Sequence, residues 1–247
     1  MGKLVGVALL CLAAVCLRGQ QIPAGTLFPV MLDDALDSGD SHPGKQVSAK
    51  LMQEVPLPDG SKVKRESKIF GKVVAASPAN AGHKARISVQ FDRIEIEKRS
   101  VAVNAGLRAL ASMEAVAAAT QPTNANSGLG TSSWDWNMVL VGGQAAFNGQ
   151  RTVKSQRGQV VGRIPEPGAV LAIPMANPAR GCPAPVANTA EQAFWVFSTD
   201  ACGVYGDKEL TFTSGIGGTG PGRIVLTAPK KVVVRKGSGW LLEVNGP

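Results

Sequence analysis

Short apolar runs, broken every few residues by glycine or proline, are the feature that most limits the folds open to this chain. Its 247 residues include 29 Gly and 16 Pro. In the C-terminal part, the runs 223–227, 231–235 and 240–244 are strand-sized and have turn residues between them. Strand-sized runs at such regular spacing are typical of sandwiches and barrels. The sequence therefore predicts an all-β, mainly antiparallel fold, either a barrel or a sandwich.

The segment 86–96 shows the clearest strand pattern. Ile87, Val89 and Phe91 alternate with polar residues, whereas Ile94 and Ile96 follow the opposite parity. Side chains on a strand alternate between the two faces, so this change of parity at Asp92-Arg93 predicts a β-bulge or a bend. The turn at 98–100 then leads into another apolar run, which predicts a hairpin.

The stretch 107–119 is ambiguous. Its alanine content and the spacing of Leu107 and Leu110 favour a short helix. Alternatively, its first half continues the strand of the preceding hairpin. The sequence does not decide between the helix and the strand. No other stretch of the chain is expected to form a helix.

The middle of the chain is poorly patterned. Residues 120–133 are polar and rich in Asn, Gly and Ser, and residues 165–185 carry many prolines. Such composition is typical of irregular segments. We expect a single β-rich domain over residues 20–247, with a loop-rich insertion at about 120–190.

The first nineteen residues differ from the rest. Lys3 precedes an uncharged apolar run from Leu4 to Leu17, and Gly19 follows it. This order is typical of a secretory signal peptide, and the run is shorter than the roughly 20 apolar residues of a membrane span. We expect residues 1–19 to direct export to the periplasm or the medium. An uncleaved anchor that keeps the protein at the cell envelope is the alternative.

Export would leave two of the four cysteines, Cys182 and Cys202. An even pair in an exported protein predicts a disulfide, which would close a loop of roughly 20 residues and contribute about 3 kcal/mol. Loss of Lys3 and Arg18 would leave 24 basic against 18 acidic residues, a net charge of +6. That charge permits binding to anionic polymers without requiring it.

Residues for catalysis are sparse. The chain has two histidines, neither in a motif, so a nucleophile activated by histidine is not expected. Paired carboxylates for hydrolysis could come from Asp135, Glu191, Asp200 or Asp207, but their spacing does not show that any two face each other. We expect no enzyme activity, no catalytic residues, no cofactor and no metal site.

Two groups of residues are candidates for binding a partner or a polymer. Lys62, Lys64, Lys68 and Lys72 share one parity and would give a basic strand face, although a solvated face is the simpler interpretation. Trp134 and Trp136 could form an adhesive patch if exposed, or pack into the core if buried. Nucleic acid is not an expected partner, because aromatic residues are not interleaved with these lysines.

The N-terminal part resembles the opening of the TrbI-like barrel domain of conjugation and type IV secretion channels. In that family a Gly-Thr strand start, a Pro-Gly turn, a strand and a Gly-Ser strand recur in this order. The similar stretches here are 22–30 with Gly25-Thr26, 36–38, Pro43-Gly44, 47–49 and Ser67-Lys68-Ile69-Phe70-Gly71. The resemblance implies a β-barrel scaffold that assembles with copies of itself. This chain has Glu66-Ser67 in place of Gly-Ser, and it lacks the family's long Pro-rich linker and inner-membrane helix.

The layout of the whole chain is similar to a group of uncharacterised exported proteins of Acidobacteria-like bacteria. The segments 194–206 and 237–244 carry that likeness, which implies no activity. Together these observations favour an exported structural or scaffold protein that self-associates or binds another envelope protein. A carbohydrate or cell-wall binding module is the alternative, and a hydrolase with paired carboxylates is a weaker one.

Overall fold

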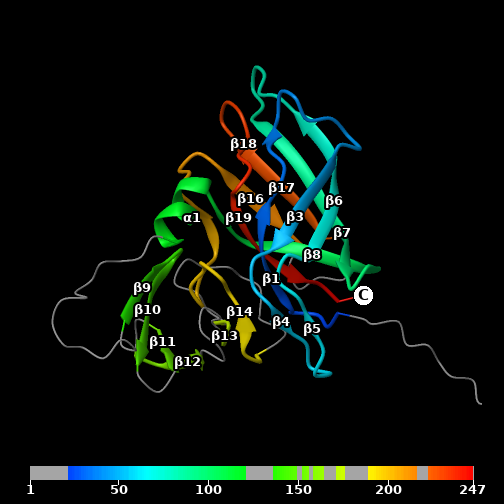
Figure 1. The fold of residues 1–247 in the computed structure, drawn as a ribbon. Helices are drawn as coiled ribbons and strands as arrows, with labels where there is room; N and C mark the ends of the chain where they lie inside the picture. The colour runs from blue at the N-terminus through cyan, green and yellow to red at the C-terminus, as the bar shows by residue number, and fades with distance from the viewer. Residues whose placement is uncertain are drawn as a thin grey trace, which may run out of the picture.

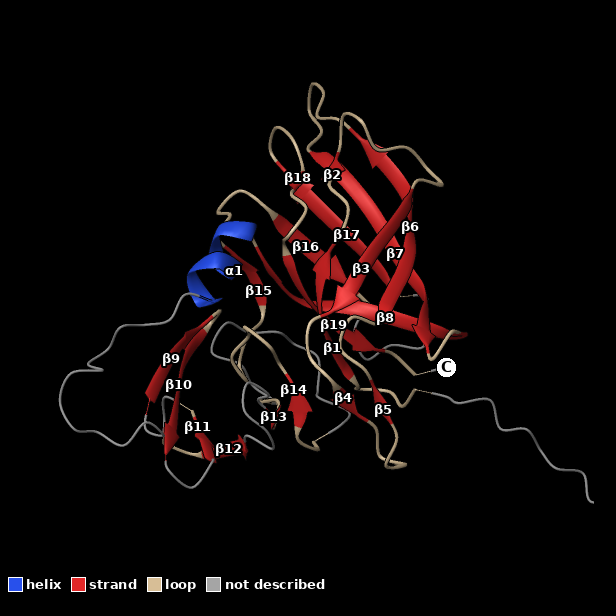
Figure 2. Cartoon of the chain, viewed as in Figure 1, coloured by secondary structure: helices blue, strands red, loops and turns tan. Residues whose placement is uncertain are grey.

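The computed structural model describes residues 22–120, 136–148, 152–155, 158–163, 171–175, 189–215 and 222–246. Within them, strands dominate and a single helix is present (Figure 2). The all-β expectation is therefore confirmed, and pairing is antiparallel everywhere between named strands except for β15 (Gly203–Tyr205) on β8 (Arg99–Ala111).

A closed barrel forms the larger part of the fold (Figure 1). Its strands run in the order β8–β19–β1–β3–β6–β7, and pairing of β7 with β8 closes the ring. Besides β8, the bounds are β19 Gly239–Val244, β1 Leu27–Leu32, β3 Gln46–Leu51, β6 Lys68–Ser77 and β7 Ala85–Ile96.

Further strands extend this sheet or flank the barrel. β17 (Arg223–Ala228) pairs with the first half of β7 and with β16 (Thr211–Ser214), while β15 lies beside the end of β8. Two small pairs complete the barrel region, namely β2 (Leu36–Asp37) with β18 (Val233–Val234) and β4 (Val55–Pro56) with β5 (Lys62–Val63).

The predicted bulge in 86–96 is confirmed. Phe91 pairs with Gly71 and Arg93 pairs with Phe70, so Asp92 is the extra residue on β7. The extra residue reverses the parity of the strand, which lets Phe91 and Ile94 both point into the barrel core. The hairpin from β7 to β8 is also confirmed, but its turn is at Glu97 and Lys98 and not at 98–100, because β8 already begins at Arg99. Both turn residues have positive φ, as tight hairpins require.

Side chains fill the barrel. Trp240, Phe28 and Phe91 are among its largest fully buried residues, and the Phe91 and Trp240 rings meet edge to face with centroids 5.8 Å apart. Such a pair contributes about 1 kcal/mol beyond the area that it buries. The interior is therefore a packed core.

The stretch 107–119 is part strand and part helix, so each of the two alternatives holds for one half of it. Strand β8 continues to Ala111, and α1 (Met113–Thr120) begins two residues later. Ser112 caps the helix, because the Ala115 N–H donates to its Oγ at 3.1 Å. No described helix has the length and apolar character that a membrane crossing requires.

A second antiparallel sheet lies beside the barrel, within the segment expected to be loop-rich (Figure 1). Its strands follow chain order, namely β9 Trp136–Leu140, β10 Gly143–Asn148, β11 Thr152–Lys154, β12 Val160–Arg163, β13 Leu171–Ala172 and β14 Gln192–Ala193.

A second apolar cluster joins the barrel to this region. Leu27 and Leu241 face outward from the barrel, where they pack with Phe194, Val196 and Phe197. Small residues allow this close approach: a Cβ on Gly239 would come within 2.9 Å of the Val116 side chain on α1. The barrel wall is therefore buried on both sides along β1, β19 and the end of β8.

Candidate functional site

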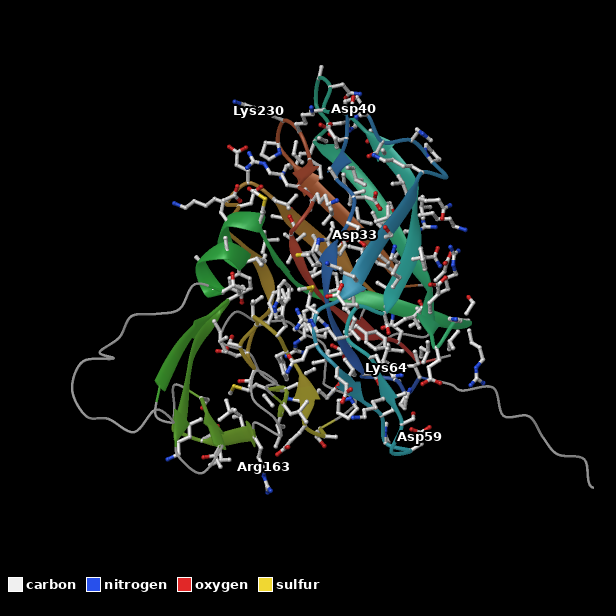
Figure 3. The ribbon with its side chains drawn as sticks, in the orientation of Figure 1. Asp33, Asp40, Asp59, Lys64, Arg163 and Lys230 are labelled. Carbon is white, nitrogen blue, oxygen red and sulfur yellow. The ribbon has the colours of Figure 1, made fainter. Side chains whose placement is uncertain are left out.

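The predicted basic face divides into two places. Lys62 and Lys64 belong to the β4–β5 hairpin region, at the end of the barrel opposite Lys230 (Figure 3). Both lysines lie beside carboxylates, Lys62 at 2.8 Å from Glu54 and Lys64 at 3.4 Å from Glu97. These pairs are exposed and contribute little stability, but they neutralise much of the local positive charge.

Lys68 and Lys72 lie on β6. Lys72 is 3.9 Å from Asp92, the bulge residue of β7. Lys68 has no carboxylate within 4.0 Å among the described residues, and its register partner on β3 is another cation, Lys50. These neighbours lie on the adjacent strands β7 and β3, so the spacing of the lysines contained no signal for them.

Sequence reasoning missed a cation on the same face. The Arg93 guanidinium stacks 4.5 Å from the centroid of the Phe70 ring, across the β6–β7 pair. This contact covers one face of the aromatic residue that lies between Lys68 and Lys72 on β6. That face of the ring is therefore already occupied by a cation.

The candidate tryptophans and cysteines are only partly described. Trp136 begins β9, where the register places it opposite Phe147, and Trp134 lies outside the described residues. Cys202 is buried, and Cys182 lies outside the described residues. The Cys202 N–H donates to the Tyr205 hydroxyl at 2.9 Å, which fixes the loop before β15.

The candidate carboxylates have local roles. Asp200 accepts a hydrogen bond from the Ser198 hydroxyl at 2.6 Å, and Glu191 lies 3.8 Å from Arg163. Asp207 accepts backbone hydrogen bonds in its own loop, from Glu209 at 2.9 Å. Asp135 lies outside the described residues.

The main charged pair inside the protein is Arg108 with Glu243. Nη1 of Arg108 lies 3.5 Å from Oε2 of Glu243, and the side chains are 1% and 2% exposed. Arg108 is the extra residue of a bulge in β8, because Leu107 pairs with Leu242 and Ala109 with Leu241. The bulge turns the guanidinium outward, where it donates to the Met175 carbonyl at 3.0 Å.

Burial changes the titration of both partners. Removal from water raises the pKa of Glu243, and the positive charge of Arg108 opposes this rise. Burial likewise lowers the pKa of Arg108, against the opposing effects of Glu243, Tyr205 and Asp200. The pair lies where the barrel meets Met175, in the segment that follows β13.

Two buried glutamines support the same junction. Gln192 accepts the Leu27 N–H at 2.7 Å and donates to the Gly25 carbonyl at 3.2 Å. Gln53 accepts the N–H of Trp195 at 2.6 Å. These bonds satisfy backbone groups between segments distant in sequence, so the junction is specific rather than merely apolar.

A cavity of about 310 Å³ opens at the end of the barrel near α1. Its walls come from the end of β8, the start of α1, the loop 206–210 and β18 with the turn after it. Among the described residues, no group of three or more His, Cys, Asp and Glu is placed to hold a metal ion.

Comparison with known proteins adds no relative. No protein-family model matches the chain, and a search of curated proteins finds no match.

Proposed function

We propose that this protein is exported and acts as a structural or scaffold component of the cell envelope, binding its partners through its outer surface. The observation that carries the proposal is the packed barrel. Trp240, Phe28 and Phe91 fill the interior of the barrel, so a partner has to bind to its outer surface. A closed ring also leaves few unpaired strand edges, which suits a rigid, long-lived scaffold.

The buried junction adds to this rigidity. Arg108, Glu243 and Gln192 are almost fully buried where the barrel meets the segment around β14. We infer that a disulfide between Cys182 and Cys202 secures this segment in an oxidising compartment. The burial of Cys202 beside the junction supports that inference.

Self-association through the barrel is part of the proposal, supported by the resemblance of residues 22–71 to the TrbI-like domain. Size-exclusion chromatography with light scattering on residues 20–247 tests it. The expected result is an oligomer whose mass rises with concentration. A strict monomer at high concentration would remove self-association and leave a partner of another kind.

A carbohydrate or cell-wall binding module is the second candidate. The register of β9 and β10 favours it by placing two aromatic residues, Trp136 and Phe147, opposite each other. Co-sedimentation with peptidoglycan and with acidic polysaccharides tests it. A module of this kind loses binding when Trp134 and Trp136 are both changed to Ala, whereas unchanged binding removes the candidate.

A further inference from the structure

The cavity at the end of the barrel has an apolar floor. Leu110, Leu210 and Val234 line it and also belong to the barrel core, where they are at most 4% exposed. The cavity therefore reaches from the surface down to the hydrophobic core. A short apolar group placed there would be removed from water.

Two exposed apolar side chains lie at its mouth, beside charged ones. Met113 on α1 is 39% exposed and Val233 on β18 is 42% exposed, and both line the cavity. They are two of the four large hydrophobic residues that are exposed among the described ones. Exposed apolar side chains gathered around a concave surface mark a binding site better than scattered ones do.

Polar groups also line the cavity. Glu114 and Arg235 form an ion pair across it, with Nη1 and Oε1 2.6 Å apart. Asp207 has no cation within 4.0 Å among the described residues, and its Oδ1 accepts the N–H groups of Glu209 and Leu210. Ser238 also lines the cavity and is 2% exposed.

We propose that this cavity binds a small amphiphilic ligand that carries a short apolar chain and a positively charged amine. The apolar chain lies on Leu110, Leu210 and Val234. The ammonium group contacts Asp207, and the Ser238 hydroxyl supplies a further hydrogen-bonding group inside the cavity.

The charged residues that line the cavity favour a positively charged ligand over a negatively charged one. The lining holds two carboxylates and one guanidinium, and Arg235 is already neutralised by Glu114. The carboxylate of Asp207 is left to attract a ligand of opposite charge. The volume of about 310 Å³ is at the small end of the range for ligand sites, so a short chain fits it best.

Three probes of matched length test the proposal on the full chain: n-pentylamine, pentanoate and n-pentanol. Binding is followed by the shifts of backbone amide signals in nuclear magnetic resonance spectra. We expect the amine to bind most tightly and to shift the backbone amide signals of Ser112, Gly206 and Arg235. Equal binding of the three probes, or shifts spread away from the lining residues, would overturn it.

Asp207→Asn is the decisive variant, because asparagine retains the Oδ1 acceptor that holds the loop. We expect it to weaken amine binding by about threefold to tenfold while leaving pentanol binding unchanged. Asp59→Asn is the matched control, since Asp59 also accepts hydrogen bonds in its own turn, from Ser61, at the far end of the barrel (Figure 3). Equal amine binding by both variants and the unaltered protein would contradict the proposal.

A second pair of variants tests the apolar mouth. Met113→Ala should weaken all probes with a pentyl chain, whereas Val160→Ala, at an exposed site on β12, should not. Neither side chain is buried, so both variants are expected to fold. If Met113→Ala binds the amine as tightly as the unaltered protein does, the apolar contact is absent and the proposed orientation is wrong.

Discussion

Arg108 and Glu243 form a buried ion pair between two neighbouring barrel strands, with 3.5 Å between Nη1 and Oε2. The bulge at Arg108 turns its side chain to the outer wall of the barrel, where it meets the Met175 carbonyl in the segment that follows β13. Burying two charges is costly, and the cost of losing one partner is larger still. The pair holds the Arg108 guanidinium in place, and its hydrogen bond to the Met175 carbonyl ties the outer segment to the barrel.

Removal of one partner should be strongly destabilising. We expect Arg108→Met to lower the free energy of unfolding by about 3–5 kcal/mol, because Glu243 would be left buried without its cation. Urea unfolding measures the change. The double variant Arg108→Met, Glu243→Leu should be less destabilised than Arg108→Met alone, since it buries no charge.

An exposed pair supplies the control. Glu54→Gln removes the partner of Lys62, whose side chain is 56% exposed, and should change stability by less than about 1 kcal/mol. Equal effects of Arg108→Met and Glu54→Gln would show that the buried pair has no special role.

Glu243 should also make stability depend on pH. Burial raises its pKa in the folded state above the ordinary value of 4.5. The folded protein then binds a proton more tightly than the unfolded chain, so this contribution to stability is complete below about pH 4.5 and is lost as the pH rises through the folded-state pKa.

The difference between the unaltered protein and Glu243→Gln isolates this contribution from other groups. Unfolding free energies of both proteins at several pH values should diverge as the pH rises above 4.5. Parallel curves would mean that the pKa of Glu243 is the same in both states.

Gly71 should not tolerate a side chain. A Cβ at this position would overlap the backbone of Gln90 and Phe91 on β7, beside the Asp92 bulge. We expect Gly71→Ala to cost about 1–3 kcal/mol in thermal or urea unfolding. Gly39→Ala is the control, because its new Cβ would meet only side-chain atoms of Asp37 and Lys231, and little change is expected there.

The lysine surface gives a prediction about charge. Glu54 forms an ion pair with Lys62, and Glu97 forms one with Lys64. The double variant Glu54→Gln, Glu97→Gln should elute from a sulfated-polysaccharide column at higher salt than the unaltered protein, because it carries two more net positive charges. If the double variant and the unaltered protein elute at the same salt concentration, the polymer does not bind at Lys62 and Lys64.

Local features of the fold could be predicted from sequence. The parity change at Asp92 is visible because a bulge shifts the alternation of a single strand, and the strand pattern of Ile87 to Phe91 needs no tertiary information. The second half of 107–119 has the alanine content of α1. Its first half was not decidable, since an apolar strand buried on both faces shows no alternation.

The candidate site depended on contacts between distant segments. Nothing near Arg108 in the sequence indicates that it is buried, since its partner lies on β19 and its carbonyl acceptor is Met175. The end cavity likewise joins α1, the loop 206–210 and β18. Composition and spacing describe single segments, so they could not reveal either arrangement.

Our proposal rests above all on export, by which the chain leaves the cytoplasm and folds where thiols oxidise. Mass spectrometry of the protein recovered from fractionated cells of its host tests it directly. We expect an envelope or secreted form that begins near residue 20 and holds Cys182 and Cys202 in one disulfide. Full-length protein in the cytosol with both thiols free would contradict it.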